Sequence, residues 1–239
     1  MIKIENTEVM GWEHAIRGMR NPLNSWDKMD SHDCPCHDGL DCSCPMVEGI
    51  QEPSIECKEA LEKSAFCVGE NDYTLMMRLA EAGPEHAKYR RMIVVYADVT
   101  APLYWWKEYD TYKVGTVANS CSTMHKIHSK QFELADFSHE HLTIASASAL
   151  QDVIYTLNYW RAQYDLADTD NLRKACWWQL IQLLPSSYNQ RRTLMLNYEV
   201  LANIYKQRKN HKLDEWTEFC KWIEELPYSV LITGKRCEV

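Results

Sequence analysis

Residues Thr100–His128 form the stretch TAPLYWWKEYDTYKVGTVANSCSTMHKIH, in which closely spaced aromatic residues precede a run of small polar ones. Trp105 and Trp106 are adjacent, and three tyrosines lie close by. Aromatic faces beside short hydrogen-bonding side chains are typical of a pocket for a planar, phosphorylated ligand. An aromatic core helix followed by a polar loop explains the same composition. The residues alone leave both interpretations open.

The segments around the tryptophans predict a strand, a helix and a loop. Arg91–Val99 is rich in β-branched residues and predicts a strand. Thr100 is expected to cap the next helix, with Pro102 in its first turn, where a missing N–H costs nothing. The run after Gly115 is expected to be a loop that feeds a second helix, whose N-terminus helps to hold an anion. A capped helix start beside a solvated loop is the alternative.

The remaining elements predict one mixed domain. Met1–Glu5 is expected to be a short strand, and the sequence predicts helices at Gly11–Met19, Asn71–Ala82, Ser146–Asp165, Asp170–Leu184, Ser187–Arg208 and Leu213–Leu226. Asn21–Val68 is rich in Pro, Gly, Asp, Ser and Cys in its first half, and we interpret it as an insertion with a short helix near Ile55–Ser64. We therefore expect a single α+β domain over residues 1–239 with a Cys-rich insertion at about residues 21–68.

The composition limits the classes of function. The chain has 239 residues, of which 46% are hydrophobic, which is enough for a packed core. Its formal net charge of −8 disfavours nucleic-acid or anionic-membrane binding, because both require a basic face. No apolar run approaches the roughly 18 residues that span a bilayer, and the N-terminus lacks the apolar centre of a signal peptide. We expect a cytoplasmic protein that binds neither nucleic acid nor membrane.

Soft metal ligands cluster in the insertion, at Cys34, Cys36, His37, Cys42 and Cys44. Zinc takes four tetrahedral thiolate or imidazole ligands, so the cluster is a candidate zinc site. The Cys-x-Cys spacing is tighter than structural zinc sites usually show. Reduced thiols on a surface insertion are the alternative, and a redox role is a weaker one.

The polar residues that follow the tryptophans suit a phosphorylated ligand. Tyr112 supplies a ring and a hydroxyl, and Lys113 supplies a point positive charge. Asn119, Ser120 and Ser122 offer short donors for a phosphate or for the edge of a pyrimidine. The one strongly basic run, KQRKNHK at Lys206–Lys212, is either a solvated helix end or a second source of ligand contacts.

The order of these features resembles, in a degenerate form, the signature of flavin-dependent thymidylate synthases. In that family a strand and a helix lead to Arg-His-Arg, then to Asn-Glu and to a serine followed by Arg-Tyr. The similar positions here are Thr111-Tyr112-Lys113, Asn119-Ser120, Ser122 and Met124-His125. An upstream Gly-His region of the family is similar to Gly83–His86, and the family's tail is similar at Leu184-Pro185, Asn197, Leu201, Asn203, Arg208, His211 and Trp216.

The resemblance implies a fold, an activity and partners. The implied fold is a small sheet with flanking helices and a mostly helical C-terminal half. The implied activity is reductive methylation of a deoxyuridine monophosphate-type nucleotide, with FAD as cofactor and methylene-tetrahydrofolate as carbon donor. Members of the family are homotetramers whose active sites form between subunits, so a tetramer is expected here.

The resemblance also implies roles for single residues. Lys113 and Ser122 become the candidate catalytic residues, Lys113 on the nucleotide phosphate and Ser122 orienting the pyrimidine without covalent attack. The substrate-binding set adds Tyr112, Asn119 and Ser120. The flavin-binding set is His86, Asn203, Arg208 and His211.

The departures from the family pattern concern charge. Both arginines of Arg-His-Arg are absent, and lysine cannot reproduce the bidentate contact of a guanidinium with phosphate. Glu199 stands where the family has a nucleotide-binding arginine, and Met124 replaces another. A catalytically altered nucleotide-binding protein on the same fold is therefore an alternative, and a metal-binding interaction module is another.

Overall fold

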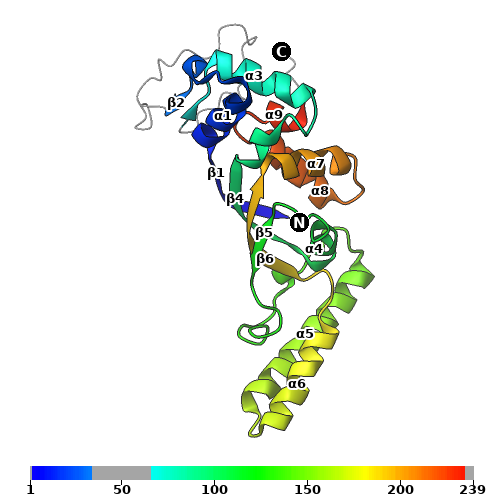
Figure 1. Ribbon diagram of the computed structural model, residues 1–239. Helices are drawn as coiled ribbons and strands as arrows, with labels where there is room; N and C mark the ends of the chain where they lie inside the picture. The colour runs from blue at the N-terminus through cyan, green and yellow to red at the C-terminus, as the bar shows by residue number, and fades with distance from the viewer. Residues whose placement is uncertain (1, 34–65, 235–239) are drawn as a thin grey trace, which may run out of the picture. The chain divides into compact units, whose positions relative to one another are not determined.

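The computed structural model describes residues 2–33 and 66–234, and it combines helices with a small sheet (Figure 1). The predicted α+β class is confirmed. The main sheet has the strand order β1-β4-β6-β5, formed by β1 (Lys3–Met10), β4 (Val94–Pro102), β6 (Asn189–Asn197) and β5 (Val117–Ser120). The five predicted zinc ligands and the helix expected near Ile55–Ser64 lie outside the described residues.

The chain forms two compact units. One unit, which contains α7 (Tyr198–Arg208) and is called the α7 unit, comprises residues 6–97, 112–117 and 194–239. The other, which contains a pair of long helices and is called the hairpin unit, comprises residues 1–5, 98–111 and 118–193. Strands β1, β4 and β6 each contribute residues to both units.

The α7 unit is mainly helical. Its elements are α1 (Trp12–Arg20), η1 (Asn21–Leu23), η2 (Trp26–Lys28), the paired strands β2 (His32–Asp33) and β3 (Phe66–Cys67), α3 (Glu70–Glu81), η3 (Lys88–Arg91), α7 (Tyr198–Arg208), α8 (Asp214–Glu224) and α9 (Val230–Thr233). As predicted, one face of α1 is buried, because its apolar residues recur at helical spacing: Trp12, Ala15, Ile16 and Met19. Gly11 precedes this helix with φ +92°, and a Cβ there would lie 2.2 Å from the Met92 carbonyl oxygen.

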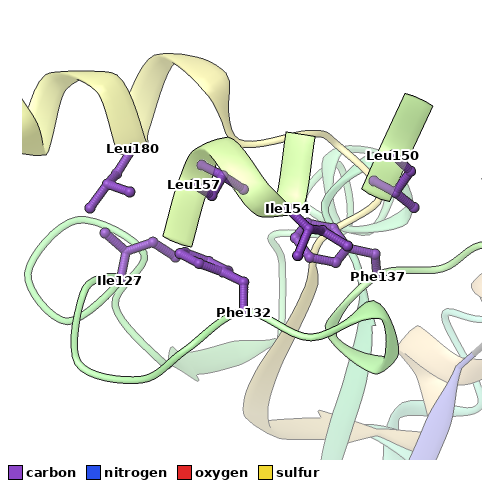
Figure 2. Packing of buried hydrophobic residues seen from close by; sticks show 7 residues of the cluster. All are labelled: Ile127, Phe132, Phe137, Leu150, Ile154, Leu157 and Leu180. Carbon is purple, nitrogen blue, oxygen red and sulfur yellow. The ribbon is translucent and has the colours of Figure 1, made fainter. Parts of the chain in front are cut away.

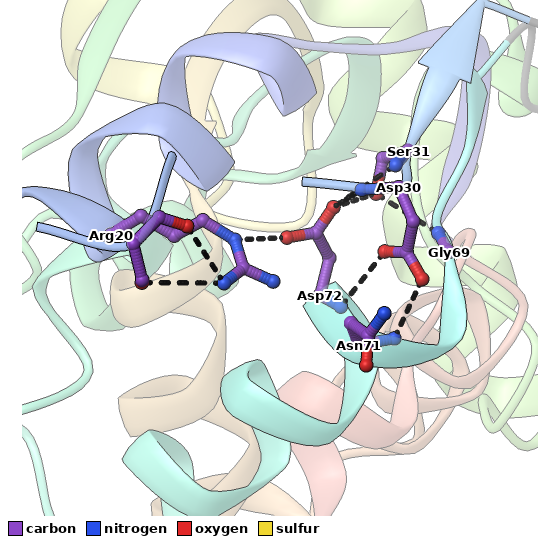
Figure 3. A network of polar contacts seen from close by, with 7 residues as sticks. Arg20, Asp30, Ser31, Gly69, Asn71 and Asp72 are labelled. Atoms are coloured by element: carbon purple, nitrogen blue, oxygen red, sulfur yellow. Dashed lines mark hydrogen bonds and ion pairs between the residues drawn. The ribbon is translucent and has the colours of Figure 1, made fainter. Parts of the chain in front are cut away.

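A buried ion pair joins α1 to α3 (Figure 3). Arg20 Nε donates to Asp72 Oδ1 at 2.6 Å, and the two side chains are 3% and 0% exposed. The other carboxylate oxygen of Asp72 accepts from the backbone N–H groups of Asp30 and Ser31, both at 3.0 Å, and from the Ser31 hydroxyl at 2.6 Å. A buried carboxylate is stable only with such partners, so this network fixes residues 30 and 31 against α3.

The same segment also caps α3. The Asp30 carboxylate accepts from the backbone N–H groups of Asn71 at 2.8 Å and Asp72 at 3.1 Å. These are donors of the first helical turn, which have no partner within the helix. Gly69 N–H donates to the Ser31 hydroxyl at 2.9 Å. Asp30 and Ser31 are therefore joined to Gly69 and the first turn of α3 by one polar network.

The hairpin unit contains α4 (Leu103–Tyr109), η4 (Leu134–Asp136) and two long helices, α5 (Ile144–Leu166) and α6 (Asp170–Leu183). Both long helices were predicted, with bounds that differ by at most two residues. A hydrophobic cluster joins them to the segments on both sides of η4 (Figure 2), through Ile127, Phe132, Phe137, Leu150, Ile154, Leu157 and Leu180. The Asn158 amide reinforces this packing, because it exchanges two hydrogen bonds of 2.9 Å with the backbone of Phe132.

The tryptophans of the opening stretch belong to the core of the hairpin unit. Trp105 and Trp106 are 0% and 1% exposed, and Trp106 Nε1 donates to the Gln190 carbonyl oxygen at 2.9 Å. Burial raises the pKa of the neighbouring Tyr109 hydroxyl. The core interpretation of these aromatic residues is therefore the right one, and the ligand interpretation of the tryptophans is wrong.

Three local predictions are wrong. Strand β4 continues through Thr100 to Pro102, so Thr100 does not cap a helix and α4 begins at Leu103. The run after Gly115 forms the exposed strand β5 and does not feed a helix. Ser187–Arg208 is the strand β6 followed by α7, not one helix. Within the described residues, no helix is long and apolar enough to span a bilayer.

We expect Asp72→Asn to lower the free energy of unfolding by about 3 kcal/mol, because it leaves the buried Arg20 charge without its partner. Burial acts to raise the pKa of Asp72, but hydrogen bonds from Ser31 and Arg20 outweigh it and lower the pKa. The carboxylate therefore contributes stability above its unfolded pKa of about 3.9, and this stability is lost as the pH falls through the lower folded pKa. Urea denaturation between pH 7 and pH 2 measures both effects.

The exposed Asp27→Asn is the matched control and should change stability by less than about 0.5 kcal/mol. Equal stability of Asp72→Asn and the unaltered chain at pH 7 would contradict the assigned role of the ion pair.

Candidate functional site

The start of α7 brings the segment 112–117 close to that helix. Asn197 caps α7, because its side-chain oxygen accepts from the Val200 N–H at 3.0 Å. Its amide nitrogen also donates to the Gly115 carbonyl oxygen at 3.4 Å. Gly115 has φ +78°, and a Cβ there would lie 2.9 Å from the Asn197 amide nitrogen and 3.2 Å from Val200. Only glycine allows this approach without strain.

Tyr112 connects this segment to the far end of α7. Its hydroxyl accepts from Arg208 Nε at 2.8 Å and donates to Gln207 Oε1 at 3.0 Å. Gln207 in turn donates from its amide to Asn203 Oδ1 at 2.8 Å. Tyr112 thus contacts Arg208 directly and Asn203 through Gln207, and Tyr112, Asn203 and Arg208 were all predicted as ligand contacts.

Aromatic rings hold the Arg208 guanidinium from two directions. Its Cζ lies 4.8 Å from the centre of the Trp216 ring and 5.6 Å from that of Tyr112. Such cation–π contacts restrict a flexible side chain to one orientation. Trp216 is fully buried. His211 packs edge-on against the same ring, with centroids 6.3 Å apart.

The environment of the site is mixed in polarity. Tyr112 is buried, whereas Lys113, Asn203 and Gln207 are exposed. The site therefore presents a positioned cation and two amides to solvent above an aromatic base. Such a set can hold a phosphate and hydrogen-bond the edge of a heterocycle.

Glu199 has a partner that the sequence did not reveal. Arg90 Nη1 lies 3.8 Å from Glu199 Oε2, and the two side chains are 12% and 23% exposed. The Arg90 guanidinium, which belongs to η3, thus balances the negative charge of Glu199. An acid in the first turn is also favourable to the dipole of α7. Beside this pair, burial raises the pKa of the Tyr89 hydroxyl to about 12.

The other predicted residues lie outside this cluster. His86 lies in the turn before η3, and no described hydrogen bond, ion pair or ring contact joins it to Tyr112 or Arg208. Asn119 and Ser120 are exposed on β5 in the hairpin unit. In the same unit, Ser122 Oγ accepts from the backbone N–H groups of Met124 at 3.2 Å and His125 at 2.9 Å.

Gln207 was not predicted as a member of the cluster. Gln207 lies one helical turn from Asn203, and this i, i+4 spacing was the available signal. The predicted zinc ligands lie outside the described residues. Among the residues that are described, no group of three or more His, Cys, Asp or Glu side chains is arranged to hold a metal ion.

Comparison with known proteins identifies the fold. The sequence matches no protein-family model and no curated protein. Two crystal structures of the flavin-dependent thymidylate synthase ThyX from Helicobacter pylori, both with FAD and dUMP, are similar to this chain. Their TM-scores are 0.60 and 0.62 at 13% sequence identity, over 98% and 99% of this chain and 98% and 100% of the ThyX chains. The chain has the ThyX fold, as the resemblance implied.

We expect Tyr112→Phe to destabilise the protein by about 2 kcal/mol, because Arg208 loses the acceptor of a charge-assisted hydrogen bond and Gln207 loses a donor. Urea denaturation at pH 7 measures the loss. Tyr96→Phe, at an exposed tyrosine of β4, is the control and should have little effect. If the two substitutions cost the same, Tyr112 does not organise the site as described.

Proposed function

We propose that the chain binds FAD and a pyrimidine nucleotide and performs reductive methylation of a deoxyuridine monophosphate-type substrate. The observation that carries this proposal is Arg208, whose guanidinium is fixed by Tyr112 and Trp216 on the polar side of α7. It is supported by the fold, because the similar ThyX structures were solved with FAD and dUMP.

The residues present fit a phosphorylated, planar cofactor. Arg208 and Lys113 supply positive charge, and Asn203 and Gln207 supply exposed amides. Gly115 lets this segment pack directly against the Asn197 and Val200 side chains at the start of α7. When bound, FAD supplies the reducing equivalents of the reaction.

In this proposal the side chains bind and orient, and none acts as a nucleophile. Arg208 and Asn203 hold the cofactor, together with His211 and His86. Lys113 neutralises the nucleotide phosphate and Tyr112 keeps Arg208 in place.

The remaining proposed substrate contacts rest on the family resemblance alone. Asn119, Ser120 and Ser122 bind the pyrimidine, with Ser122 orienting it. Methylene-tetrahydrofolate is the proposed carbon donor.

A nucleotide-binding protein without catalysis is the second candidate. The Glu199–Arg90 pair favours it, because it places a balanced charge where the family has a nucleotide-binding arginine. Nucleotide affinity then depends on Arg208 and Lys113 alone. A metal-binding interaction module, with zinc at the Cys-rich insertion, stays a prediction.

We further propose that the protein is a homo-oligomer, in line with the expected tetramer. Helix α5 contains only three charged residues, yet several large apolar side chains of α5 and α6 are exposed: Ile144, Tyr155, Tyr159, Leu166, Leu172, Trp178 and Leu183. An apolar surface of this extent is typical of a subunit interface.

We expect the purified protein to show flavin absorbance, or to acquire it when FAD is added. Arg208→Gln should weaken FAD binding by about tenfold or more, because it removes a positioned charge. Lys206→Gln, on the same helix, is the control and should leave the affinity unchanged. Fluorescence titration with FAD gives both affinities.

The outcomes separate the two candidate functions. A colourless protein that binds no FAD but melts at a higher temperature with deoxyuridylate supports the second candidate and contradicts the first. Zinc found by elemental analysis would support the interaction module.

We expect the unaltered chain to sediment as a tetramer and the double substitution Tyr155→Glu and Leu166→Glu to sediment as a smaller species, because buried charges are costly at an interface. Asp168→Lys, in the turn between α5 and α6, is the charge-changing control. A monomeric unaltered chain at micromolar concentration would contradict the proposed assembly.

A further inference from the structure

The hydrogen bonds that join Tyr112 to α7 run in one direction. A guanidinium has donors and no acceptor, so the Tyr112 hydroxyl must accept the bond from Arg208 Nε at 2.8 Å. The hydroxyl then donates its own proton to Gln207 Oε1 at 3.0 Å. Arg208 therefore decides which atom of the Gln207 amide faces the tyrosine, and that atom is the oxygen.

The same direction continues from Gln207 to Asn203. With Oε1 facing Tyr112, the Gln207 amide directs Nε2 at Asn203 and donates to Oδ1 at 2.8 Å. Among the described residues, no group accepts a hydrogen bond from Asn203 Nδ2, and the Asn203 side chain is exposed. Asn203 therefore presents its two N–H groups to solvent, while its oxygen is engaged by Gln207.

The buried end of this relay sets the orientation of the exposed end. Two exposed amides one helical turn apart interact only weakly, so Gln207 and Asn203 alone would populate both orientations. Tyr112 is 8% exposed, and the Arg208 guanidinium lies 4.8 Å from the centre of the buried Trp216 ring. The charge-assisted bond between these two anchored groups is roughly twice as strong as a neutral one, and it imposes its direction on both amides.

We propose that Gln207 is a positioning residue, which makes Asn203 a hydrogen-bond donor to the ligand of the candidate site. Lys113 and Arg208 are also donors without acceptor capacity, so the site selects a ligand edge made of acceptors: a phosphate oxygen or a ring carbonyl. An exocyclic amine is disfavoured there, because its N–H groups would meet N–H groups. This inference rests on the proposed function, in which Asn203 holds the cofactor.

Neutron diffraction from deuterium-exchanged crystals of the full-length chain without ligand tests the relay directly, because deuterons distinguish an amide nitrogen from an amide oxygen. We expect deuterons on the Gln207 atom that faces Asn203 and on the Asn203 atom that faces solvent. Deuterons on the Gln207 atom that faces Tyr112 would overturn the proposal. This measurement needs no ligand, so its result is independent of FAD binding.

A fluorescence titration with FAD tests the effect on the ligand. Gln207→Met keeps an unbranched side chain and removes both relay bonds, so it should raise the dissociation constant about tenfold, as loss of one oriented hydrogen bond does. Asn203→Ala should raise it by a similar factor, and the double substitution should raise it no further, because Gln207 acts through Asn203. Additive losses would show that Gln207 acts by another route and would contradict its positioning role.

Gln151→Met, at an exposed glutamine of α5, is the matched control and should leave the dissociation constant unchanged. Both Gln207 and Asn203 are exposed, so their variants are expected to fold.

Two further titrations separate the possible acceptors. Riboflavin carries the ring carbonyls without a phosphate, and ADP carries phosphates without the flavin ring. Loss of riboflavin affinity in Asn203→Ala assigns a ring carbonyl to Asn203, and loss of ADP affinity assigns a phosphate oxygen. Unchanged affinity for both would overturn the proposal. A chain that binds none of the three ligands contradicts the proposed function, whereas the neutron structure still decides the orientation of the two amides.

Discussion

The buried pair of Arg20 and Asp72 is the constraint on which the arrangement of the α7 unit depends. Removing two charges from water is costly, and the cost is recovered only when the remaining lone pairs are used. Asp72 meets this condition with the backbone and hydroxyl of Ser31 and the backbone of Asp30, whereas Arg20 Nη2 has no described partner. We therefore infer that the main role of the pair is to fix the positions of the segments that it joins. It fixes α1, α3 and the segment at Asp30 and Ser31 relative to one another.

The candidate site depends on a second crossing of the chain, which is held by two amide contacts of Asn197 and one charge-assisted hydrogen bond from Arg208. Asn197 caps α7 and contacts Gly115, and the chain then places Tyr112 against Arg208, 96 residues further on. The neutral hydrogen bonds of Asn197 each contribute about 1 kcal/mol net, and the bond from the charged Arg208 contributes about 2 kcal/mol. The arrangement is specific because Gly115 permits an approach that any Cβ would prevent.

Predictions from the sequence were right for helices whose apolar residues recur at helical spacing. They were wrong where the intrinsic helix propensity of a segment disagrees with its environment in the fold. Helices α1, α5, α6 and α8 were predicted within two residues at each end, and in α1 and α8 the signal is one apolar face. Strand β6 was predicted as helix, since its Leu-Met-Leu run has high helix propensity, and only pairing in the sheet overrides that preference. The tryptophans were ambiguous for a related reason, because aromatic composition does not distinguish a core from a pocket. Gln207 was missed because its role depends on a tyrosine that is distant in sequence.

The charges along α7 determine where an anion can bind. At its start, Glu199 opposes the positive end of the helix dipole and pairs with Arg90, so this end attracts anions less than most helix N-termini do. At its other end, Arg208 faces the negative end of the dipole, and any phosphate there is held by side-chain charge alone. Side-chain charge near the surface is screened within about 10 Å at 0.1 M salt. Ligand binding at the candidate site is therefore more sensitive to salt than binding at a helix N-terminus. The start of α7 thus has balanced charge, and the positive charge of the candidate site comes from Arg208 and Lys113.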